Sequence, residues 1–265
     1  MYLHDFGTGK MYTAVKAAMA LWGLEWKQAN DKLKSHYAQI NEEVIEVSPK
    51  VPVVLDFVFD EYKGNYWNQF GVTLATLKRF NVRYVRTLYK NECVAGRSTA
   101  NNPIFLYTFI SKRVKIYRPL SPDKTKKWGG NATMDDIGGI NCLPKKGTLC
   151  FITSSVKDCM VLWEHGFPAV CMQGEGYGAY GESTEVMASL IKELKQRFRY
   201  VFFFMDNDTP GRTYTDKLHA LHGLEYCFTE KEKDISDYRK KFKGNLTTRL
   251  LKKIIVKAWK KSDGQ

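Results

Sequence analysis

The stretch YVFFFMDNDTPGRTYTDKL (200–218) decides the fold of this chain. Its apolar run YVFFFM has the composition of a buried strand, and Pro210 suits the first turn of a helix. Asp206 and Asp208 stand between these two elements. A strand, an acidic loop and a helix in this order predict one unit of a parallel α/β sheet, with carboxylates beyond the carboxyl end of the strand.

The same alternation continues on both sides of this stretch. Strands are predicted at 149–153, 168–172, 200–205 and 224–228, and helices at 156–166, 184–198 and 209–221. Strands that alternate with helices imply right-handed crossovers and a parallel sheet. Because parallel strands end at one edge, we expect the following loops to meet along one rim: 153–158, 173–183 and 206–212.

The first half of the chain has a different rhythm and predicts α+β structure. Residues 1–40 are expected to form one or two helices, with an apolar stripe formed by Val15, Met19, Trp22 and Trp26. A short helix is predicted after Thr73 as its N-cap. Alternating apolar residues at 104–109 and 114–119 predict two antiparallel strands.

The chain is strongly basic, with 41 basic and 28 acidic residues and a formal net charge of +13. Such an excess favours a polyanionic partner, because lysine and arginine release counterions from phosphates. Cations and aromatic rings alternate in KRVKIYRP (112–119) and KTKKWGGN (124–131), where the rings could stack on bases; a solvated basic face is the alternative. The basic segment 239–261 has apolar residues at helical spacing, and we expect it to dock on the body; a helix that binds a membrane surface or a partner is the alternative.

Other classes of function find little support. The six cysteines form no CxxC pair and no histidine stands at ligand spacing, which predicts buried thiols and no zinc site. GTGK (7–10) lacks the spacing of a phosphate-binding loop. No apolar run reaches the roughly 18–20 residues that span a bilayer, and the N-terminus lacks the plan of a signal peptide. We therefore expect no membrane partner and a cytoplasmic location.

The pair Asp206 and Asp208 predicts a metal site only because of where it stands in the sequence. Carboxylate oxygens, waters and substrate phosphates are the ligands that Mg²⁺ accepts. A lone DxD is more typical of a turn or a helix cap. Its place at the end of a buried parallel strand, before a helix, favours a metal site.

Six segments, in the same order along the chain, resemble the catalytic core of bacterial and phage DNA primases. VFFFMDNDTPGRTYTDKL (201–218) is similar to the second signature of the Toprim fold, and LCFITSSVKDCMVLWEHG (149–166) is similar to the first. KEKDISDY (231–238) resembles the segment that ends the Toprim region of these primases. The upstream segments are HDFGTG (4–9), YWNQFGVTLATLKRFNV (66–82) and the interval from KIYRP to KKWGGN (115–131), which resemble the start of the core and its basic N-terminal half.

The resemblance implies an α/β fold with a Toprim-type parallel sheet flanked by helices, preceded by a mixed α+β basic N-terminal subdomain. It divides the chain into four parts. These are a helical segment (1–40), a nucleic-acid- and nucleotide-binding subdomain (41–145), a Toprim metal-binding domain (146–238) and a basic C-terminal helix (239–265).

The resemblance also implies roles for individual residues. Asp206 and Asp208 would hold the catalytic Mg²⁺ (or Mn²⁺), Asp158 would join this metal set, and Asp234, with Asp237 beside it, would support a further metal. The residues expected to bind nucleic acid or nucleotide are Arg113, Lys115, Arg118, Lys127, Trp128, Asn131 and Lys157.

One position departs from the Toprim pattern. The family's glutamate should stand where this sequence has Ser154, and serine cannot replace a carboxylate as metal ligand or general base. Either the site is inactive and the chain is a binding module, or the carboxylate lies on a neighbouring strand end. Glu175 follows the strand at 168–172, and adjacent parallel strand ends lie about 5 Å apart. We favour relocation, with Glu175 as a catalytic and metal-binding residue.

The function that the resemblance implies is that of a DNA primase, which makes RNA primers from NTPs on a single-stranded DNA template during phage or bacterial DNA replication. Two alternatives stay open: a Toprim nuclease or topoisomerase-like phosphoryl-transfer enzyme, and an inactive single-stranded DNA-binding module. The expected partners are the template, NTPs and a replicative helicase supplied in trans. The expected location is the cytoplasm, which is that of the host for a phage-encoded chain.

Overall fold

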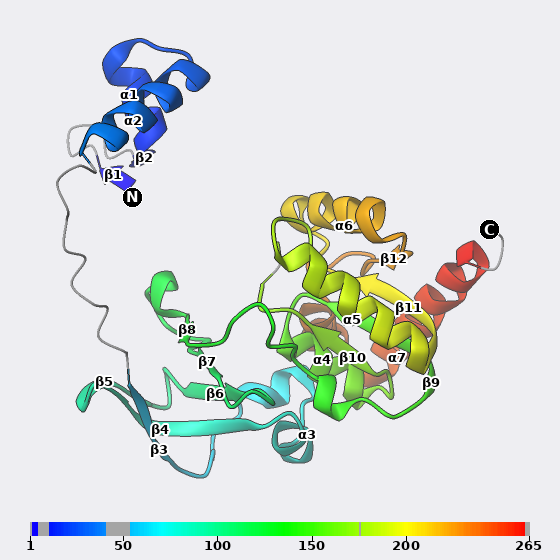
Figure 1. Ribbon diagram of the computed structural model, residues 1–265. Helices are drawn as coiled ribbons and strands as arrows, with labels where there is room; N and C mark the ends of the chain where they lie inside the picture. The colour runs from blue at the N-terminus through cyan, green and yellow to red at the C-terminus, as the bar shows by residue number, and fades with distance from the viewer. Residues whose placement is uncertain (1, 5–10, 41–53, 175, 263–265) are drawn as a thin grey trace. The chain divides into compact units, whose positions relative to one another are not determined.

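The computed structural model describes residues 2–4, 11–40, 54–174 and 176–262 (Figure 1). The chain divides into two compact units, residues 1–52 and 53–265. Residues 5–10, which hold most of HDFGTG and the GTGK segment, lie outside the described residues, as does Glu175. The division into four parts predicted from the sequence stays a prediction.

The first unit contains a strand pair and two helices. Strands β1 (Tyr2–His4) and β2 (Met11–Thr13) are antiparallel, and helices α1 (Ala14–Trp22) and α2 (Trp26–Ile40) follow. Gly23 ends α1 in the left-handed conformation, with φ of 64°. The predicted single stripe is therefore wrong: Trp22 and Trp26 lie in different helices, and Trp26 is 56% exposed.

The second unit begins with a six-stranded antiparallel sheet. Its strands are β3 (Leu55–Phe59), β4 (Val82–Lys90), β5 (Cys93–Arg97), β6 (Ile104–Thr108), β7 (Val114–Tyr117) and β8 (Trp128–Gly130). The order is β3-β4-β6-β7-β8, and β5 pairs with β4. The two strands predicted at 104–109 and 114–119 are confirmed as the antiparallel pair β6 and β7.

Short helices cover one face of this sheet. The 3-10 helix η1 (Tyr66–Phe70) and helix α3 (Leu74–Arg79) contribute Trp67, Phe70 and Leu77 to a core that also contains Phe105 of β6. The predicted cap is confirmed, because the Thr73 hydroxyl accepts a hydrogen bond from the backbone N–H of Thr76. Two further 3-10 turns are η2 (Lys124–Lys126) and η3 (Ile140–Cys142).

A four-stranded parallel sheet follows, as the alternation predicted. Its strands are β9 (Gly147–Thr153), β10 (Ala169–Cys171), β11 (Phe198–Phe204) and β12 (Tyr226–Cys227), in the order β10-β9-β11-β12. The helices between them are α4 (Val156–Glu164), α5 (Ser183–Arg197) and α6 (Thr209–His222).

Both faces of the parallel sheet are buried, which explains its continuous apolar runs. Phe151 and Phe202 belong to the core that includes residues of α4, whereas Ile152 and Phe203 belong to the core that includes residues of α5 and α6. Alternate side chains along each strand thus face opposite layers of helices.

The C-terminal helix α7 (Ile235–Ser262) is interrupted at Lys243, where φ is 54° and ψ is 177°. It begins before the predicted start at 239. Its apolar face is buried at Leu250, Leu251, Ile254 and Ile255, so the predicted docking on the body is confirmed. Among the described helices, none has the length and apolar character needed to cross a membrane.

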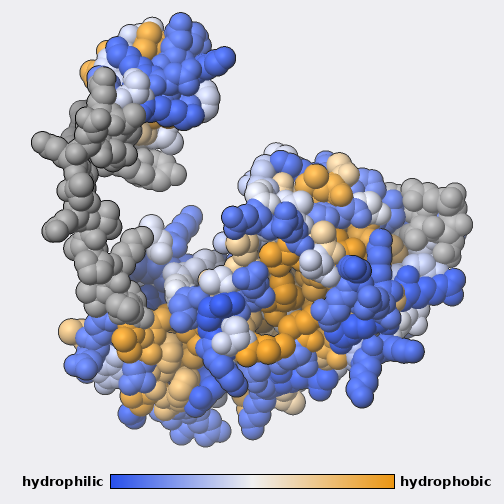
Figure 2. Space-filling view, in the orientation of Figure 1, coloured by the Kyte–Doolittle hydropathy of each residue, from blue (hydrophilic) through white to orange (hydrophobic). Residues whose placement is uncertain are grey.

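Figure 2 shows hydrophilic side chains over much of the visible face, around a hydrophobic area near its middle. The two sheets thus supply different surfaces. The parallel sheet ends in a rim of polar loops, and the antiparallel sheet ends at β8 in a basic and aromatic edge.

Candidate active site

A cleft of about 410 Å³ lies where the rim of the parallel sheet faces strands β7 and β8. Ser154 follows β9, Gln173 follows β10 and Asp206 follows β11, and all three line it. The predicted meeting of the three loops is therefore confirmed at these residues. The opposite wall comes from the antiparallel sheet and includes Lys115 and Trp128.

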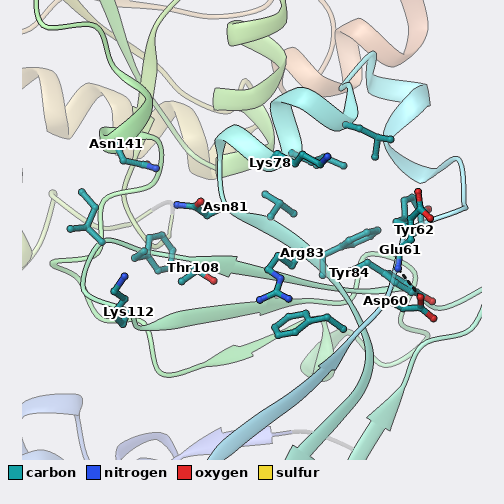
Figure 3. A pocket seen from close by; sticks show the side chains of 17 residues that line it. Asp60, Glu61, Tyr62, Lys78, Asn81, Arg83, Tyr84, Thr108, Lys112 and Asn141 are labelled. Atoms are coloured by element: carbon teal, nitrogen blue, oxygen red, sulfur yellow. Dashed lines mark hydrogen bonds between the residues drawn. The ribbon is translucent and has the colours of Figure 1, made fainter.

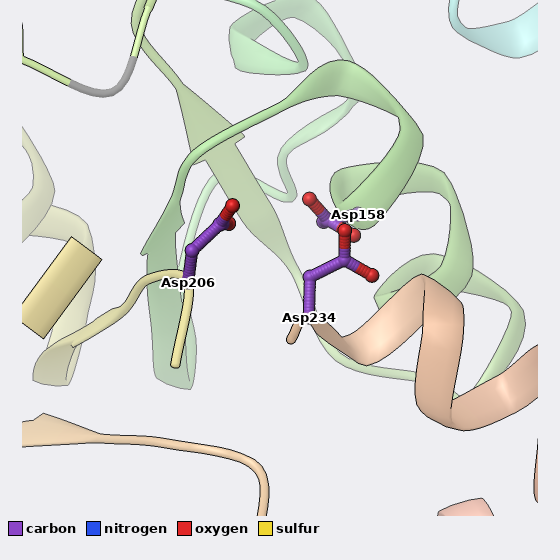
Figure 4. A group of neighbouring side chains, drawn as sticks. All are labelled: Asp158, Asp206 and Asp234. Carbon is purple, nitrogen blue, oxygen red and sulfur yellow. The ribbon is translucent and has the colours of Figure 1, made fainter. Parts of the chain in front are cut away.

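Three aspartates converge at one end of this cleft. Asp158, Asp206 and Asp234 each offer a carboxylate oxygen, and these atoms all lie within 4.8 Å of one another. Figure 4 shows the three side chains converging from the first turn of α4, the loop after β11 and the segment before α7. Carboxylates so close together repel each other unless a cation or a proton lies between them.

Asp158 is the most deeply buried member of this acidic cluster, with 2% of its surface exposed. The hydroxyl groups of Ser155 and Ser236 both donate hydrogen bonds to its carboxylate. Burial, reinforced by the charge of Asp234, raises the pKa of Asp158 to about 7. A nearby positive charge would therefore strongly stabilise the ionised form of this carboxyl group.

Ser154 lies inside the acidic cluster. Its hydroxyl oxygen is 2.5 Å from Oδ1 of Asp206 and 3.3 Å from Oδ2 of Asp158. Serine brings no charge, so the cluster has one carboxylate fewer than a glutamate at this position would give. The hydroxyl instead positions the two aspartates that it contacts.

Two lysines balance the acidic cluster. Nζ of Lys233 lies 3.0 Å from Oδ2 of Asp206 and 2.6 Å from Oδ2 of Asp208, and Nζ of Lys157 lies 3.5 Å from Asp234. Burial disfavours the charge on Lys157, but the carboxylates of Asp158 and Asp234 outweigh it and raise its pKa. The ammonium of Lys233 occupies a position between two carboxylates, as a bound cation would.

Lys233 was not predicted from the sequence. Its signal was present, because it directly precedes Asp234 in the KEKDISDY segment. The backbone N–H of Asn207 donates to the carbonyl of Lys233 at 2.6 Å, and this contact holds the lysine beside the end of β11.

Asp208 lies outside the group of three. It is the N-cap of α6, and its Oδ1 accepts a hydrogen bond from the backbone N–H of Gly211 at 2.9 Å. Its other oxygen is paired with Lys233, and this hydrogen bond lowers the pKa of Asp208. Asp237 also stands apart, although its backbone N–H donates to Asp234.

The wall opposite the acidic cluster is aromatic and basic. Trp128 stacks on Tyr117 with ring centroids 4.4 Å apart, and 42% of its surface is exposed. Nζ of Lys115 lies 4.7 Å from the Trp128 ring, and that of Lys127 lies 5.8 Å from it. Burial lowers the pKa of Lys115, whose ammonium donates to the carbonyl of Gln173 at 2.5 Å. A flat ring beside cations suits a base with its phosphates.

The structure thus brings four of the predicted nucleic-acid-binding residues into the cleft: Lys115, Lys127, Trp128 and Lys157. The other three lie elsewhere. Arg113 forms an ion pair with Asp136 at 2.7 Å, Arg118 is partly buried, and Asn131 accepts a hydrogen bond from the backbone N–H of Val114. Their roles in binding stay predictions.

The donor set fits a hard divalent cation. Mg²⁺ and Mn²⁺ prefer oxygen ligands, and the acidic cluster offers carboxylate oxygens from three elements together with a hydroxyl. Lys233 would have to leave Asp206 for a second ion to lie between Asp206 and Asp208. The arrangement suits metal-assisted chemistry on a phosphate.

No family model and no curated protein matches the chain. Solved structures do. The primase fragment of the bacteriophage T7 primase-helicase protein is 14% identical over 71% of this chain and 72% of its own, with a TM-score of 0.49. A DNA primase domain from Pseudomonas aeruginosa is 14% identical over 70% and 68%, with a TM-score of 0.48.

A third structure is that of the bacteriophage T7 lagging-strand DNA polymerase interacting with primase domains bound to an RNA/DNA hybrid and dTTP. The match is 13% identical and covers 77% of this chain and 92% of the other, with a TM-score of 0.50. At this identity the likeness concerns the fold alone. The resemblance to phage primases is confirmed at that level: the chain has a primase-like fold.

Proposed function

We propose that this chain is a DNA primase that joins ribonucleotides into short RNA primers on a single-stranded DNA template. The observation that carries the proposal is the acidic cluster at the carboxyl edge of a parallel sheet, which faces a wall of lysines around Trp128. A Toprim-type sheet next to a basic subdomain is what the resemblance implies. The primase-like fold agrees with it.

Asp158, Asp206 and Asp234 would hold Mg²⁺ or Mn²⁺. When bound, the ion would neutralise the triphosphate and acidify the attacking hydroxyl. Lys157 and Lys233 lie beside these carboxylates, and they provide positive charge where negative charge would develop on the phosphates.

Trp128 and the lysines around it would position the incoming nucleotide. A base stacks on the exposed ring of Trp128, while Lys115 and Lys127 contact its phosphates. Arg113, Arg118 and Asn131 would then bind the template outside the cleft. We also propose a helicase partner in trans and a cytoplasmic location.

Glu175 is proposed to supply the carboxylate that Ser154 lacks. It directly follows Gly174, which lines the cleft. Replacing Glu175 with Gln should abolish primer synthesis, because the amide keeps the shape and removes the charge. Full activity in that variant would refute the relocation and leave the acidic cluster with three aspartates alone.

The test uses the whole chain with Mg²⁺ or Mn²⁺, labelled NTPs and a single-stranded DNA of mixed sequence. Primers that resist DNase and are degraded by alkali support the primase proposal. Cuts in the template indicate a nuclease, and retention of the DNA without chemistry indicates a binding module. The matched control is Asp206→Asn, which keeps the shape of the acidic cluster but not its charge.

A further inference from the structure

A groove of about 1070 Å³ in the second unit shares no lining residue with the cleft. It lies between helix α3, the end of β3 and the turn that joins β6 to β7. Figure 3 shows Lys78 on α3 above the groove, Arg83 in its middle and Lys112 at one end, with Asp60 and Glu61 at the other. We call it the α3 groove.

Within the described part of the chain, the cations of the α3 groove have no carboxylate partner. Lys78, Arg83 and Lys112 are exposed, and none of them takes part in an ion pair among the residues that the structure describes. Asp60 lies in the same groove, but it accepts a hydrogen bond from the backbone N–H of Glu61 at the opposite end from Lys112. The groove therefore presents a cationic stretch that complements an anionic ligand.

A flat face lies among these charges. The guanidinium carbon of Arg83 lies over the Phe59 ring, 3.2 Å from its centre. A guanidinium held in this way offers its outer face to another planar group and its edges to phosphate oxygens. Asn81 and Asn141, which also line the groove, can donate to and accept from the edges of a base.

Lys112 lies in the turn that forms one end of the groove. Its φ is 69° in the turn between β6 and β7, a left-handed conformation that glycine adopts without cost. This conformation closes the turn, in which the backbone N–H of Lys112 donates to the carbonyl of Phe109. The Lys112 side chain lines the α3 groove.

We propose that the α3 groove binds single-stranded nucleic acid at a second site, separate from the metal cleft. Phosphates lie on Lys78, Arg83 and Lys112, and a base stacks on the Arg83–Phe59 pair. An acidic peptide would use the cations and leave the flat face without a partner. The inference rests on the proposed function for one point, the choice of DNA as the bound strand. It does not depend on metal chemistry.

The test is the binding of a fluorescein-labelled single-stranded dT oligonucleotide, followed by anisotropy in EDTA over a range of salt concentrations. Lys78→Glu with Lys112→Glu should weaken binding about tenfold or more and flatten the dependence on salt, because each lost phosphate contact reduces the counterions released. The matched control is Lys145→Glu with Lys146→Glu, which removes the same charge from exposed lysines outside both sites. Equal effects of the two pairs would overturn the proposal.

A second measurement identifies the face that is used. Oligonucleotides carrying 5-iodouracil are crosslinked to the whole chain by light, and the adducts are located by mass spectrometry. Adducts at Phe59 or Tyr84 support the proposal, and adducts confined to Trp128 overturn it. An RNA oligonucleotide and a polyglutamate peptide complete the series. DNA bound at least as tightly as RNA and more tightly than the peptide supports the proposal, and RNA or the peptide as the preferred ligand would overturn it. Neither measurement needs primer synthesis. A failure of the primase proposal can therefore be distinguished from a failure of the groove proposal.

Discussion

The two strand–loop–helix units at the rim place their carboxylates in different ways. After β11, Asp206 stands at the end of the strand, and Asp208 caps the helix that follows. After β9 the two corresponding places hold Ser154 and the cap Ser155, and the carboxylate of Asp158 comes from the first turn of α4. The two units have similar backbones, but one brings its carboxylate to the site from a strand end and the other from the first turn of a helix.

The difference lies in how each carboxylate is neutralised. Asp206 is paired with Lys233, which is itself partly exposed, whereas Asp158 is buried beneath serine hydroxyls. The first can exchange its lysine for another cation, and the second depends on a cation or a proton close by. The β11 unit therefore explains how a metal ion could replace the lysine at Asp206. The β9 unit explains why the site needs a positive charge near Asp158.

The largest expected effect is a difference in primer synthesis between substitutions of the two aspartates of the β11 unit. Asp206→Asn should reduce primer synthesis about a hundredfold or more, because it removes a charge from the group that would hold the metal. Asp208→Asn should cost much less, since asparagine caps a helix as well as aspartate does. Initial rates of labelled primer formation measure both. An equal loss in the two variants would mean that Asp208 also carries a metal.

Much of this site could be predicted from the sequence, because its signals are local. Asp206 directly follows an apolar run, and such a run in a parallel sheet is buried on both faces. The strands β9 and β11 and the helix α6 were predicted for the same reason. Asp158 and Asp234 followed only from the resemblance, since neither stands at a strand end.

The features that were missed depend on distant parts of the chain. Lys233 reaches the acidic cluster because its backbone is bonded to Asn207, a contact that no local pattern encodes. The ion pair between Arg113 and Asp136 was not predicted either, because the two residues come together only in the fold. The N-terminal stripe failed because helical spacing was extended across Gly23, where the backbone turns left-handed.

Exchange at Asp206 gives the next prediction. Lys233→Met removes an ammonium that competes for two carboxylates, and Mn²⁺ should then bind about tenfold more tightly, a gain of about 1.4 kcal/mol. Titration of Mn²⁺ followed by electron paramagnetic resonance measures this without turnover. Lys241→Met, which removes the partner of Glu232, is the control. Weaker Mn²⁺ binding in the Lys233 variant would show that the lysine supports the metal site.

Substitutions of Trp128, on the wall opposite the acidic cluster, should change substrate binding. Trp128→Ala should raise KM for NTPs about fivefold with a smaller change in kcat, because stacking of a base on a ring contributes about 1 kcal/mol or more. Trp128→Phe should restore most of the loss, since it keeps a ring on Tyr117. Steady-state kinetics on one template separate the two constants. An unchanged KM would assign Trp128 to packing alone.

The smallest effect concerns Asp158 and the pH dependence of stability without metal. Burial raises its pKa to about 7 in the folded chain, whereas the unfolded chain has the ordinary value of 3.8. Between these values the folded state keeps a proton that the unfolded state has lost, so this residue makes stability fall as pH rises from about 4 to 7. His165, whose pKa is lowered by burial, acts in the opposite direction, so the wild-type slope alone does not isolate Asp158.

The comparison that isolates it is with Asp158→Asn. In EDTA, Tm of the wild type should fall relative to that of the variant by several degrees between pH 5 and pH 8, since about 1 kcal/mol corresponds to roughly 2–4 °C in a chain of this size. Adding Mg²⁺ at pH 8 should restore the wild type and leave the variant nearly unchanged, because only the carboxylate gains from the cation. Parallel slopes in the two proteins would mean that the hydroxyl groups of Ser155 and Ser236 already compensate the buried charge, and that the β9 unit needs no cation.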